Sequence, residues 1–339
     1  MPVHVGTIDP GEHQCGANGT QLMGTTVQKT FIGEPIASVI TICSGRKCIT
    51  PPPSSTPVSL SKAAQTTIQA SWIDKLARMP AIYTVDRLYA GRGFRLAERA
   101  AAGVGAKLYV LSAGLGLVDS SCQIPAYSLT VSPGHPDSIS ERVQGDFDPA
   151  AWFSALLRGP HSTQWANTFD HGQGRVLIAL TRPYAKMIGS SLLELPQSSL
   201  ARLRIFGASL SEILPNEVHC AIMPYDRRLD AITPGTRADF SQRALDHFVN
   251  SVTSDGCVQD CASDSAAVRR ELALITAPQQ TRRPRQTDDE ILRLIRARLS
   301  SQSGIGRVLR LLRDQDGIAC EQSRFSRLYR AVVDEDNLI

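Results

Sequence analysis

Four short apolar runs, separated by longer stretches with helical periodicity, form the clearest pattern in this chain. The runs are ASVITI, LYVL, RVLIAL and RLRIF, at residues 37–42, 108–111, 175–180 and 202–206. Continuous apolar runs of this length are typical of parallel strands that helices cover on both faces. Amphipathic helices are predicted between the first two runs, at residues 62–79 and 86–102. The alternation predicts an α/β fold, a three-layer α/β/α arrangement around a parallel sheet.

Each predicted strand ends in small or polar residues, and the second run does so most sharply. It is followed at once by Ser112, Gly114 and Gly116. In open α/β sheets, ligands bind outside the carboxyl ends of strands, where glycines let the backbone approach a ligand. Asp119 and Tyr127 follow in the same stretch, and we expect both to overhang this opening. The sequence therefore predicts the active site here.

Cationic residues follow the first and third predicted strands. After the first come Cys43, Arg46 and Lys47, and after the third comes Arg182. Such an end can grip phosphate through its backbone and its cations, and an ordinary solvated turn is an equal alternative. A solvated helix face is the default interpretation of Arg92, with contact to a ligand or nucleic acid as the alternative. Tyr89 and Phe94 beside it are interpreted as core residues.

Charges are dense in the segment from residue 221 to 249. It contains Asp226, Arg228, Arg237 and Asp239, and the two arginines are candidate DNA contacts. This density, together with two nearby prolines, indicates either a loop held by ion pairs or a catalytic loop. Asp239 also suits the cap of the helix that follows it. The pattern leaves these alternatives open.

The last fifty residues differ from the rest in charge and in pattern. Residues 282–330 contain 12 Arg against 6 acidic residues, a surplus of +6, whereas the whole chain carries +4. Helix start and stop signals predict three short helices after residue 286, as in helix-turn-helix or winged-helix modules. The arginines expected to contact DNA are Arg310, Arg313, Arg324 and Arg327. A three-helix oligomerisation bundle is the alternative.

These patterns divide the chain into four segments. Residues 1–35 lack steady periodicity and are predicted to form an irregular arm, and residues 36–253 the α/β/α catalytic domain. Residues 254–286 resemble a linker with a short helix, and residues 287–339 are the predicted DNA-binding domain.

Composition excludes several classes of protein. Eight cysteines in a chain of 339 residues, with no charged-then-apolar signal segment at Met1, indicate reduced thiols and a cytoplasmic protein. The pairs Cys43/Cys48 and Cys257/Cys261 have no histidine at finger-like spacing, so a zinc site is only a minor alternative. We expect neither a metal nor an organic cofactor. No apolar run approaches the roughly 20 residues that a bilayer span requires, and no membrane partner is expected.

Two motifs then carry a resemblance to a known family. They are LYAGRGFRLAERA, from residue 88, and YVLSAGLGLVDSSCQIPAYSLTV, from residue 109. They resemble a broad bacterial family that includes peroxide-stress proteins and uracil-DNA-glycosylase-like domains associated with queuosine- and archaeosine-type base exchange. With the MPYDRRLD and PGTRADFSQRA segments and the helical C-terminus, the chain is similar to phage-defence DNA glycosylases, which remove glucosylated hydroxymethylcytosine. The Gly-Gln-Asp-Pro-Tyr motif of classical uracil-DNA glycosylases is absent.

The resemblance implies that the protein excises a modified base from double-stranded phage DNA. Cleavage of an N-glycosidic bond passes through an oxocarbenium-like sugar, so the site needs a carboxylate to activate water or stabilise positive charge. Asp119 is the first candidate, with Asp226 and Asp239 as alternatives. The base must leave the stack, and Tyr127 and Ser112 suit its pocket by position.

Two other functions stay open at this level. The first is RNA-directed base exchange, in which Cys43 would serve as a nucleophile, although the usual zinc-binding cysteine cluster is missing. The second is a non-catalytic DNA-binding regulator. The sequence does not specify the oligomeric state.

Overall fold

The computed structural model describes residues 36–171, 173–253, 260–279, 284–299 and 304–336. The arm predicted at residues 1–35 lies outside them. The chain divides into two compact units, and each unit is built from two stretches of sequence. The first unit comprises Met1–Tyr225 with Gly235–Ala273, and the second comprises Asp226–Pro234 with Leu274–Ile339.

The first unit is built on a five-stranded, mostly parallel sheet in the order β4-β3-β1-β6-β7. The strands are β1 (Ile36–Ile42), β3 (Lys107–Ser112), β4 (Gly116–Asp119), β6 (Arg175–Ala179) and β7 (Leu203–Phe206). Only β4 runs antiparallel, beside β3 at one edge. A two-stranded antiparallel pair, β2 (Tyr83–Thr84) and β5 (Gln123–Ile124), lies apart from this sheet.

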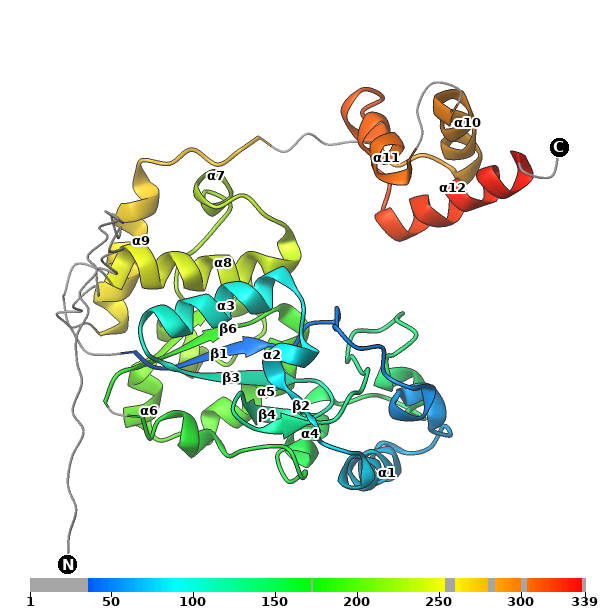
Figure 1. The fold of residues 1–339 in the computed structure, drawn as a ribbon. Coiled ribbons are helices and arrows are strands. Elements are labelled where there is room, and N and C mark those ends of the chain that lie inside the picture. Colours follow the sequence, from blue (N-terminus) through cyan, green and yellow to red (C-terminus); the bar gives the residue numbers. More distant parts are fainter. Residues whose placement is uncertain (1–35, 172, 254–259, 280–283, 300–303, 337–339) are drawn as a thin grey trace, which may run out of the picture. The chain divides into compact units, whose positions relative to one another are not determined.

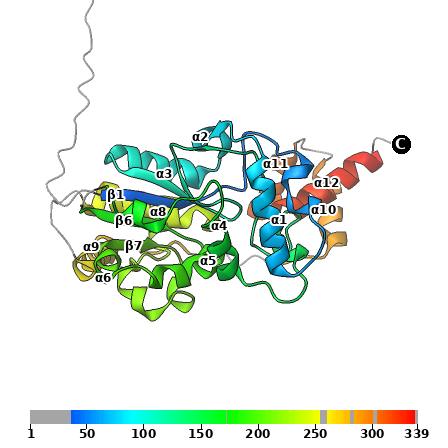
Figure 2. The same ribbon diagram turned by 90° about the horizontal axis from the view of Figure 1, so that it is seen from below.

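Helices flank both faces of the sheet (Figure 1, Figure 2). Helices α3 (Arg92–Gly103) and α8 (Phe240–His247) pack together on one face, and α4 (Pro149–Leu156) and α5 (Arg182–Leu193) on the other. The remaining helices of this unit are α1 (Gln65–Arg78), α2 (Val85–Leu88), α6 (Gln197–Arg202) and α9 (Cys261–Ala273). The predicted α/β class with a mostly parallel sheet is confirmed.

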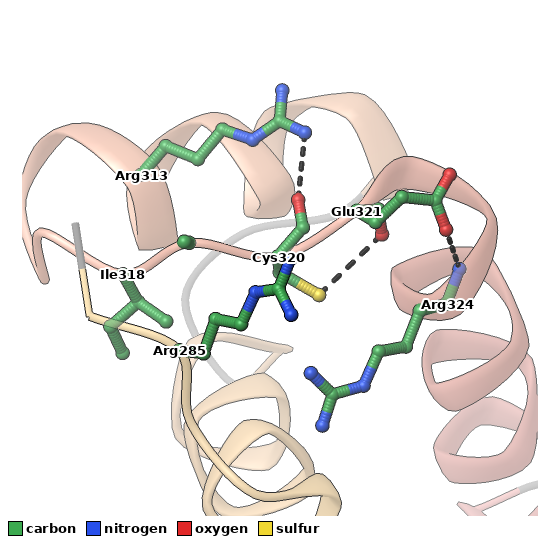
Figure 3. Close-up of a pocket in the computed structure, with 7 residues that line it drawn as sticks. Arg285, Arg313, Ile318, Cys320, Glu321 and Arg324 are labelled. Atoms are coloured by element: carbon green, nitrogen blue, oxygen red, sulfur yellow. Dashed lines mark hydrogen bonds between the residues drawn. The ribbon is translucent and has the colours of Figure 1, made fainter. Parts of the chain in front are cut away.

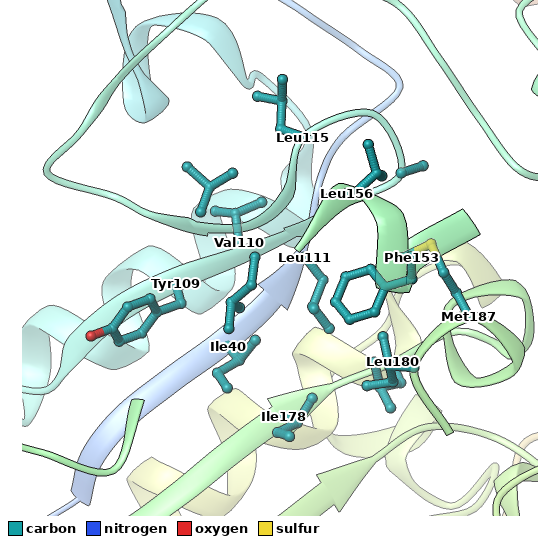
Figure 4. Close-up of a cluster of buried hydrophobic side chains, with 14 of the residues drawn as sticks. Ile40, Tyr109, Val110, Leu111, Leu115, Phe153, Leu156, Ile178, Leu180 and Met187 are labelled. Atoms are coloured by element: carbon teal, nitrogen blue, oxygen red, sulfur yellow. The ribbon is translucent and has the colours of Figure 1, made fainter. Parts of the chain in front are cut away.

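The apolar runs form strands because both faces of the sheet are covered. All five residues of β6 are buried, as are the first six of β1. Ile40, Leu111 and Ile178 from the three central strands meet Phe153 from α4 and Met187 from α5 in one core cluster (Figure 4). A strand buried on both faces has no solvent side, so its sequence is continuously apolar rather than alternating.

The strand order sets the place where a ligand can bind. From β1 the chain adds β3 on one side of β1, then crosses back to add β6 and β7 on the other. In such sheets a crevice opens at the carboxyl ends of the two strands where the direction reverses. Here these two strands are β1 and β6.

Helix α9 is tied to the opposite, amino-terminal end of β6 and β7. Asp264 in α9 accepts hydrogen bonds from Arg175 Nε at 2.9 Å and from Arg204 Nε at 2.5 Å. All three side chains are buried, and that of Arg204 is only 1% exposed. The sequence assigns this helix to a linker, whereas the structure packs it into the first unit.

The second unit contains the three C-terminal helices and a short helix from the charged segment. The C-terminal helices are α10 (Asp288–Leu299), α11 (Ile305–Asp314) and α12 (Gln322–Asp336), and the short one is α7 (Leu229–Ile232). Ile295, Val308, Leu312, Phe325 and Val332 are fully buried between the three C-terminal helices. They therefore share a core of their own.

Candidate active site at the carboxyl ends of β1, β3 and β6

The loop after β1 pairs with the segment before α3. Cys48 N donates to Leu88 O at 3.0 Å and Ala90 N donates to Arg46 O at 3.1 Å, which places Lys47 opposite Tyr89. Gly91 allows this approach, since a Cβ there would collide with the Ser44 side chain. The backbone of the strand end is thus fixed before any side chain is considered.

A buried hydroxyl cluster lies beneath this loop. The hydroxyls of Tyr89 and Tyr127 are 2.8 Å apart, and Ser112 Oγ hydrogen-bonds to the Tyr127 hydroxyl. Ser112 Oγ also accepts from the backbone N–H groups of Gly114 and Leu115, at 3.2 and 2.9 Å. Both tyrosine rings are fully buried. The end of β3 therefore holds a chain of hydrogen-bonded hydroxyls.

Residues at the carboxyl ends of β1 and β6 lie next to this cluster. Cys43 Sγ, at the end of β1, is 2.9 Å from the hydroxyl of Tyr184, in the first turn of α5 after β6. Burial holds the pKa values of Tyr127 and Tyr184 well above their usual range, with a further contribution from the nearby Cys43. Burial likewise raises the pKa of Tyr89. The phenols therefore stay protonated at neutral pH, and they can donate hydrogen bonds.

Lys47 brings a cation to the two tyrosine rings. Its Nζ lies 4.8 Å from the centroid of the Tyr127 ring and 5.9 Å from that of Tyr89, a favourable cation–π geometry. Burial lowers the pKa of Lys47, and Cys43 and Asp137 nearby act in the opposite direction. The Asp137 carboxylate is itself held by Ser128, whose Oγ donates to Oδ2 at 2.6 Å. The site thus contains a cation, a carboxylate and protonated hydroxyls.

Two tryptophans fix the glycine turn that supports the cluster. Trp72 Nε1 donates to Gly114 O at 2.7 Å, and Trp152 Nε1 donates to Ala113 O at 2.8 Å. The Tyr127 ring lies directly on Gly114, since a Cβ there would be 2.5 Å from the ring. Gly116 has φ of +89°, and a Cβ there would collide with Ser162, so the turn requires glycine at this position.

Gly114→Ala is expected to lower the free energy of unfolding by about 1–3 kcal/mol, because the rigid Tyr127 ring and the pinned turn cannot both stay in place. Gly45→Ala is the matched control, since its Cβ would meet nothing within 4 Å. We expect that change to stay within about 0.5 kcal/mol of the parent. Urea unfolding followed by tryptophan fluorescence checks both, and equal stabilities would mean that Tyr127 does not rest on Gly114.

The expected position of Asp119 is wrong. Because β4 runs back antiparallel to β3, Asp119 pairs with Tyr109 and lies beside the amino-terminal half of β3. There it forms an ion pair with Lys107 at 2.9 Å and accepts from Ser121 N at 2.8 Å. These hydrogen bonds and Lys107 hold the pKa of Asp119 low against the effect of burial. Asp119 is thus part of a structural ion pair, and it does not lie beside Tyr127.

The other two predicted carboxylates are also held by arginines. Asp239 Oδ1 accepts from Thr236 N at 2.8 Å in a capping box and pairs with Arg243 at 3.0 Å. Its second oxygen lies 3.3 Å from Arg92, whose side chain is 57% exposed. Asp226 belongs to the second unit, where it pairs with Arg228 at 2.7 Å. Of the two alternatives for the charged segment, these contacts fit a loop held by ion pairs.

The cations of the first unit that are predicted to contact phosphate differ in exposure and in their hydrogen bonds. Arg46 and Arg237 are exposed. Arg182 donates to Glu212 at 2.7 Å and to Ser209 O at 3.2 Å, so its guanidinium is partly engaged. Of these cations, Lys47 is the one whose charged end lies against the tyrosine rings of the hydroxyl cluster.

In the second unit, arginines line a pocket of about 570 Å³ beside the start of α12 (Figure 3). Arg285, Arg313 and Arg324 contribute to its wall, with Cys320 and Glu321 between them. Arg313 donates to Cys320 O at 2.8 Å. Arg324 and Arg327 both bind the Asp288 carboxylate, at 2.7 and 2.8 Å, which fixes α12 against the start of α10. Arg310 on α11 is exposed.

The sequence missed three residues of the site. Tyr184 is the last residue of the polar segment that starts at Thr181 after the third strand, so its position could have suggested a role. Tyr89 is interpreted from the sequence only as a core residue. Asp137 lies in a turn-rich segment without periodicity, which gives no signal. The structure does unite Cys43 and Lys47 with Ser112, Gly114 and Tyr127.

Several general properties complete the description. Among the described residues, no group of three or more His, Cys, Asp or Glu side chains is arranged to hold a metal ion. The six cysteines within the described ranges are free thiols, and Cys257 lies outside those ranges. Of the helices that the structure describes, none is both long and apolar enough to cross a membrane. Comparisons of the chain with protein-family models, with curated proteins and with solved structures gave no match.

Proposed function

We propose that this protein is a DNA N-glycosylase that flips a modified base out of the duplex and hydrolyses its N-glycosidic bond, leaving an abasic site. The observation that supports it best is the group formed by Lys47, Asp137 and the Tyr89/Tyr127 hydroxyls beside the carboxyl ends of β1 and β3. An extruded base needs an aromatic wall and polar groups for its edge. Hydrolysis at its sugar needs a carboxylate.

Each group has a role in this proposal. Asp137 takes the place expected for Asp119, because Ser128, the neighbour of Tyr127 in the chain, holds its carboxylate at 2.6 Å and its charge acts on Lys47. It activates the attacking water or stabilises the oxocarbenium-like sugar. The buried phenols, held protonated, donate to the departing base, and Lys47 stabilises the negative charge that develops on that base. No metal is needed for these steps.

The substrate class rests on the resemblance of the two sequence motifs. It favours glucosylated hydroxymethylcytosine in phage DNA, and hence a role in antiviral defence in the cytoplasm. The second unit, with its surplus of arginine, supplies affinity for duplex DNA of any sequence in this proposal, as phosphate contacts do. Its arrangement as a helix-turn-helix module is part of the same proposal.

The decisive experiment incubates the protein with end-labelled duplexes that contain cytosine, hydroxymethylcytosine or its glucosylated form, and then heats them with alkali. Alkali breaks the strand only at abasic sites, so breaks confined to the modified duplex support the proposal. Intact strands on every duplex, with binding retained, would instead make the protein a DNA-binding regulator. Incorporation of a labelled free base into RNA would indicate base exchange.

Arg285→Ala and Arg310→Ala are each expected to lower the slope of log affinity against log salt by about 0.9, since each removes one exposed guanidinium that can bind a phosphate. Binding to modified and plain duplexes should weaken equally. Arg293→Ala is the control, because Arg293 is paired with Glu290 at 2.7 Å. Duplex binding at several salt concentrations measures the slopes. Unchanged slopes would favour an oligomerisation bundle.

A further inference from the structure

Lys47 differs in its contacts from Lys75 and Lys107, two other lysines of the first unit. Lys75 Nζ donates to Ser54 O at 2.8 Å, and Lys107 Nζ pairs with Asp119 at 2.9 Å. Within the ranges that the structure describes, Lys47 donates no hydrogen bond and forms no ion pair, and its Nζ faces the rings of Tyr127 and Tyr89. The Lys47 ammonium therefore rests on aromatic rings, and Asp137 acts on it electrostatically without forming an ion pair.

The position of Lys47 in the fold suits a role in chemistry. It follows β1 at the switch point, and its backbone is fixed by the pairing with Leu88 and Ala90. It is half-buried, and burial lowers its pKa. A lysine becomes a nucleophile when desolvation favours the neutral amine, and here burial outweighs the opposite effect of Asp137.

We propose that Lys47 forms a Schiff base with the C1′ aldehyde of an abasic deoxyribose, so that the protein also cleaves the DNA strand at that position. The inference rests on the proposed function, because base excision generates the abasic sugar in the same site. The ligand that Lys47 takes is thus the ring-opened form of that sugar.

The reaction balances without a cofactor. The Lys47 ammonium first gives one proton to solvent water. The neutral Nζ then attacks the aldehyde carbon, a C–N bond forms, and the carbonyl oxygen leaves as water with both amine protons, giving the imine. Protonation of the imine allows C2′ to lose a proton to solvent water, and the C3′–O bond then breaks. The leaving group is the downstream strand with a 5′ phosphate. Hydrolysis of the imine frees Lys47 and an unsaturated aldehyde.

The neighbouring hydroxyls suit the dehydration step. Tyr89 and Tyr127 are protonated, because burial raises their pKa values, and their rings form the wall that Lys47 faces. A protonated phenol can donate to the carbinolamine oxygen as it leaves. The same cluster that receives the base can thus serve the second step.

The test uses the full-length protein and a duplex with a preformed abasic site, incubated with sodium cyanoborohydride, which reduces an imine to a stable amine. We expect a covalent protein–DNA adduct, and mass spectrometry of its peptides should place the adduct on Lys47. Lys47→Arg, which keeps the charge, should give no adduct above a blank without enzyme. Lys107→Arg is the matched control, and it should form as much adduct as the parent protein.

The outcomes separate this inference from the proposed function. An adduct that maps to other lysines, or one that persists in Lys47→Arg, overturns the inference. Base release that requires alkali for strand breakage, with no adduct, also overturns it and leaves the glycosylase proposal standing. Adduct formation without base release from any modified duplex would refute the proposed function alone. Circular dichroism and thermal unfolding verify that Lys47→Arg is folded.

Discussion

Asp137→Asn is expected to lower the single-turnover rate of base release by about 10²–10⁴-fold, the range for loss of a general acid or base. The asparagine keeps the size of the side chain and an oxygen that can still accept from Ser128 Oγ. The fold and the affinity for duplex DNA should therefore be preserved. Rapid-quench measurement of base release at saturating protein gives the rate, and a binding assay on the same duplex gives the affinity.

Asp119→Asn is the matched control for this prediction. Asp119 lies beside the amino-terminal half of β3, in an ion pair with Lys107, and the change should leave the rate near that of the parent protein. The reverse pattern, with Asp119→Asn inactive and Asp137→Asn active, would refute the assignment of the site to the carboxyl ends of the strands. Equal activity in both variants would remove both carboxylates from the mechanism.

Asp264→Ala is expected to lower the free energy of unfolding of the first unit by about 3–5 kcal/mol. The change leaves Arg175 and Arg204 buried without the carboxylate that both bind. Buried charges that lose their partner are strongly destabilising because the interior does not solvate them. The change also frees α9 from the sheet. Unfolding in urea is the measurement.

Tryptophan fluorescence makes this measurement specific to the first unit, because the three tryptophans, Trp72, Trp152 and Trp165, all belong to it. Asp74→Ala is the control, since Asp74 pairs with Arg78 on the surface, with side chains 59% and 75% exposed. Exposed pairs contribute about 0–1 kcal/mol. A similar small effect for Asp264→Ala would mean that α9 is not tied to the sheet.

The local pattern of the sequence predicted the main strands well. The predicted runs at residues 37–42, 108–111, 175–180 and 202–206 correspond to β1, β3, β6 and β7. Such runs are informative because a doubly covered strand must be apolar at every position, and few other elements have this requirement. The three C-terminal helices likewise lie where capping and stop signals place them.

Direction along the sheet could not be predicted from these patterns. Gly116 starts β4. The apolar residues of β4 do not indicate whether the chain continues as a loop or returns antiparallel beside β3. The antiparallel return moves Asp119 to the far end of β3, whereas Tyr127 stays at the carboxyl end. A pairing direction depends on hydrogen bonds between distant residues, which a local pattern does not contain.

By itself, the sequence determined that this protein has an α/β unit with small and cationic residues after its strands, and an arginine-rich helical C-terminus. Those properties are local, since periodicity, turn chemistry and charge are read from neighbours in the chain. Only the tertiary structure decided which polar groups meet: Lys47 over Tyr127, Cys43 beside Tyr184, and Arg324 with Asp288. The reason is that strand order and helix packing choose these partners, and both depend on burial of apolar faces contributed by residues far apart in the chain.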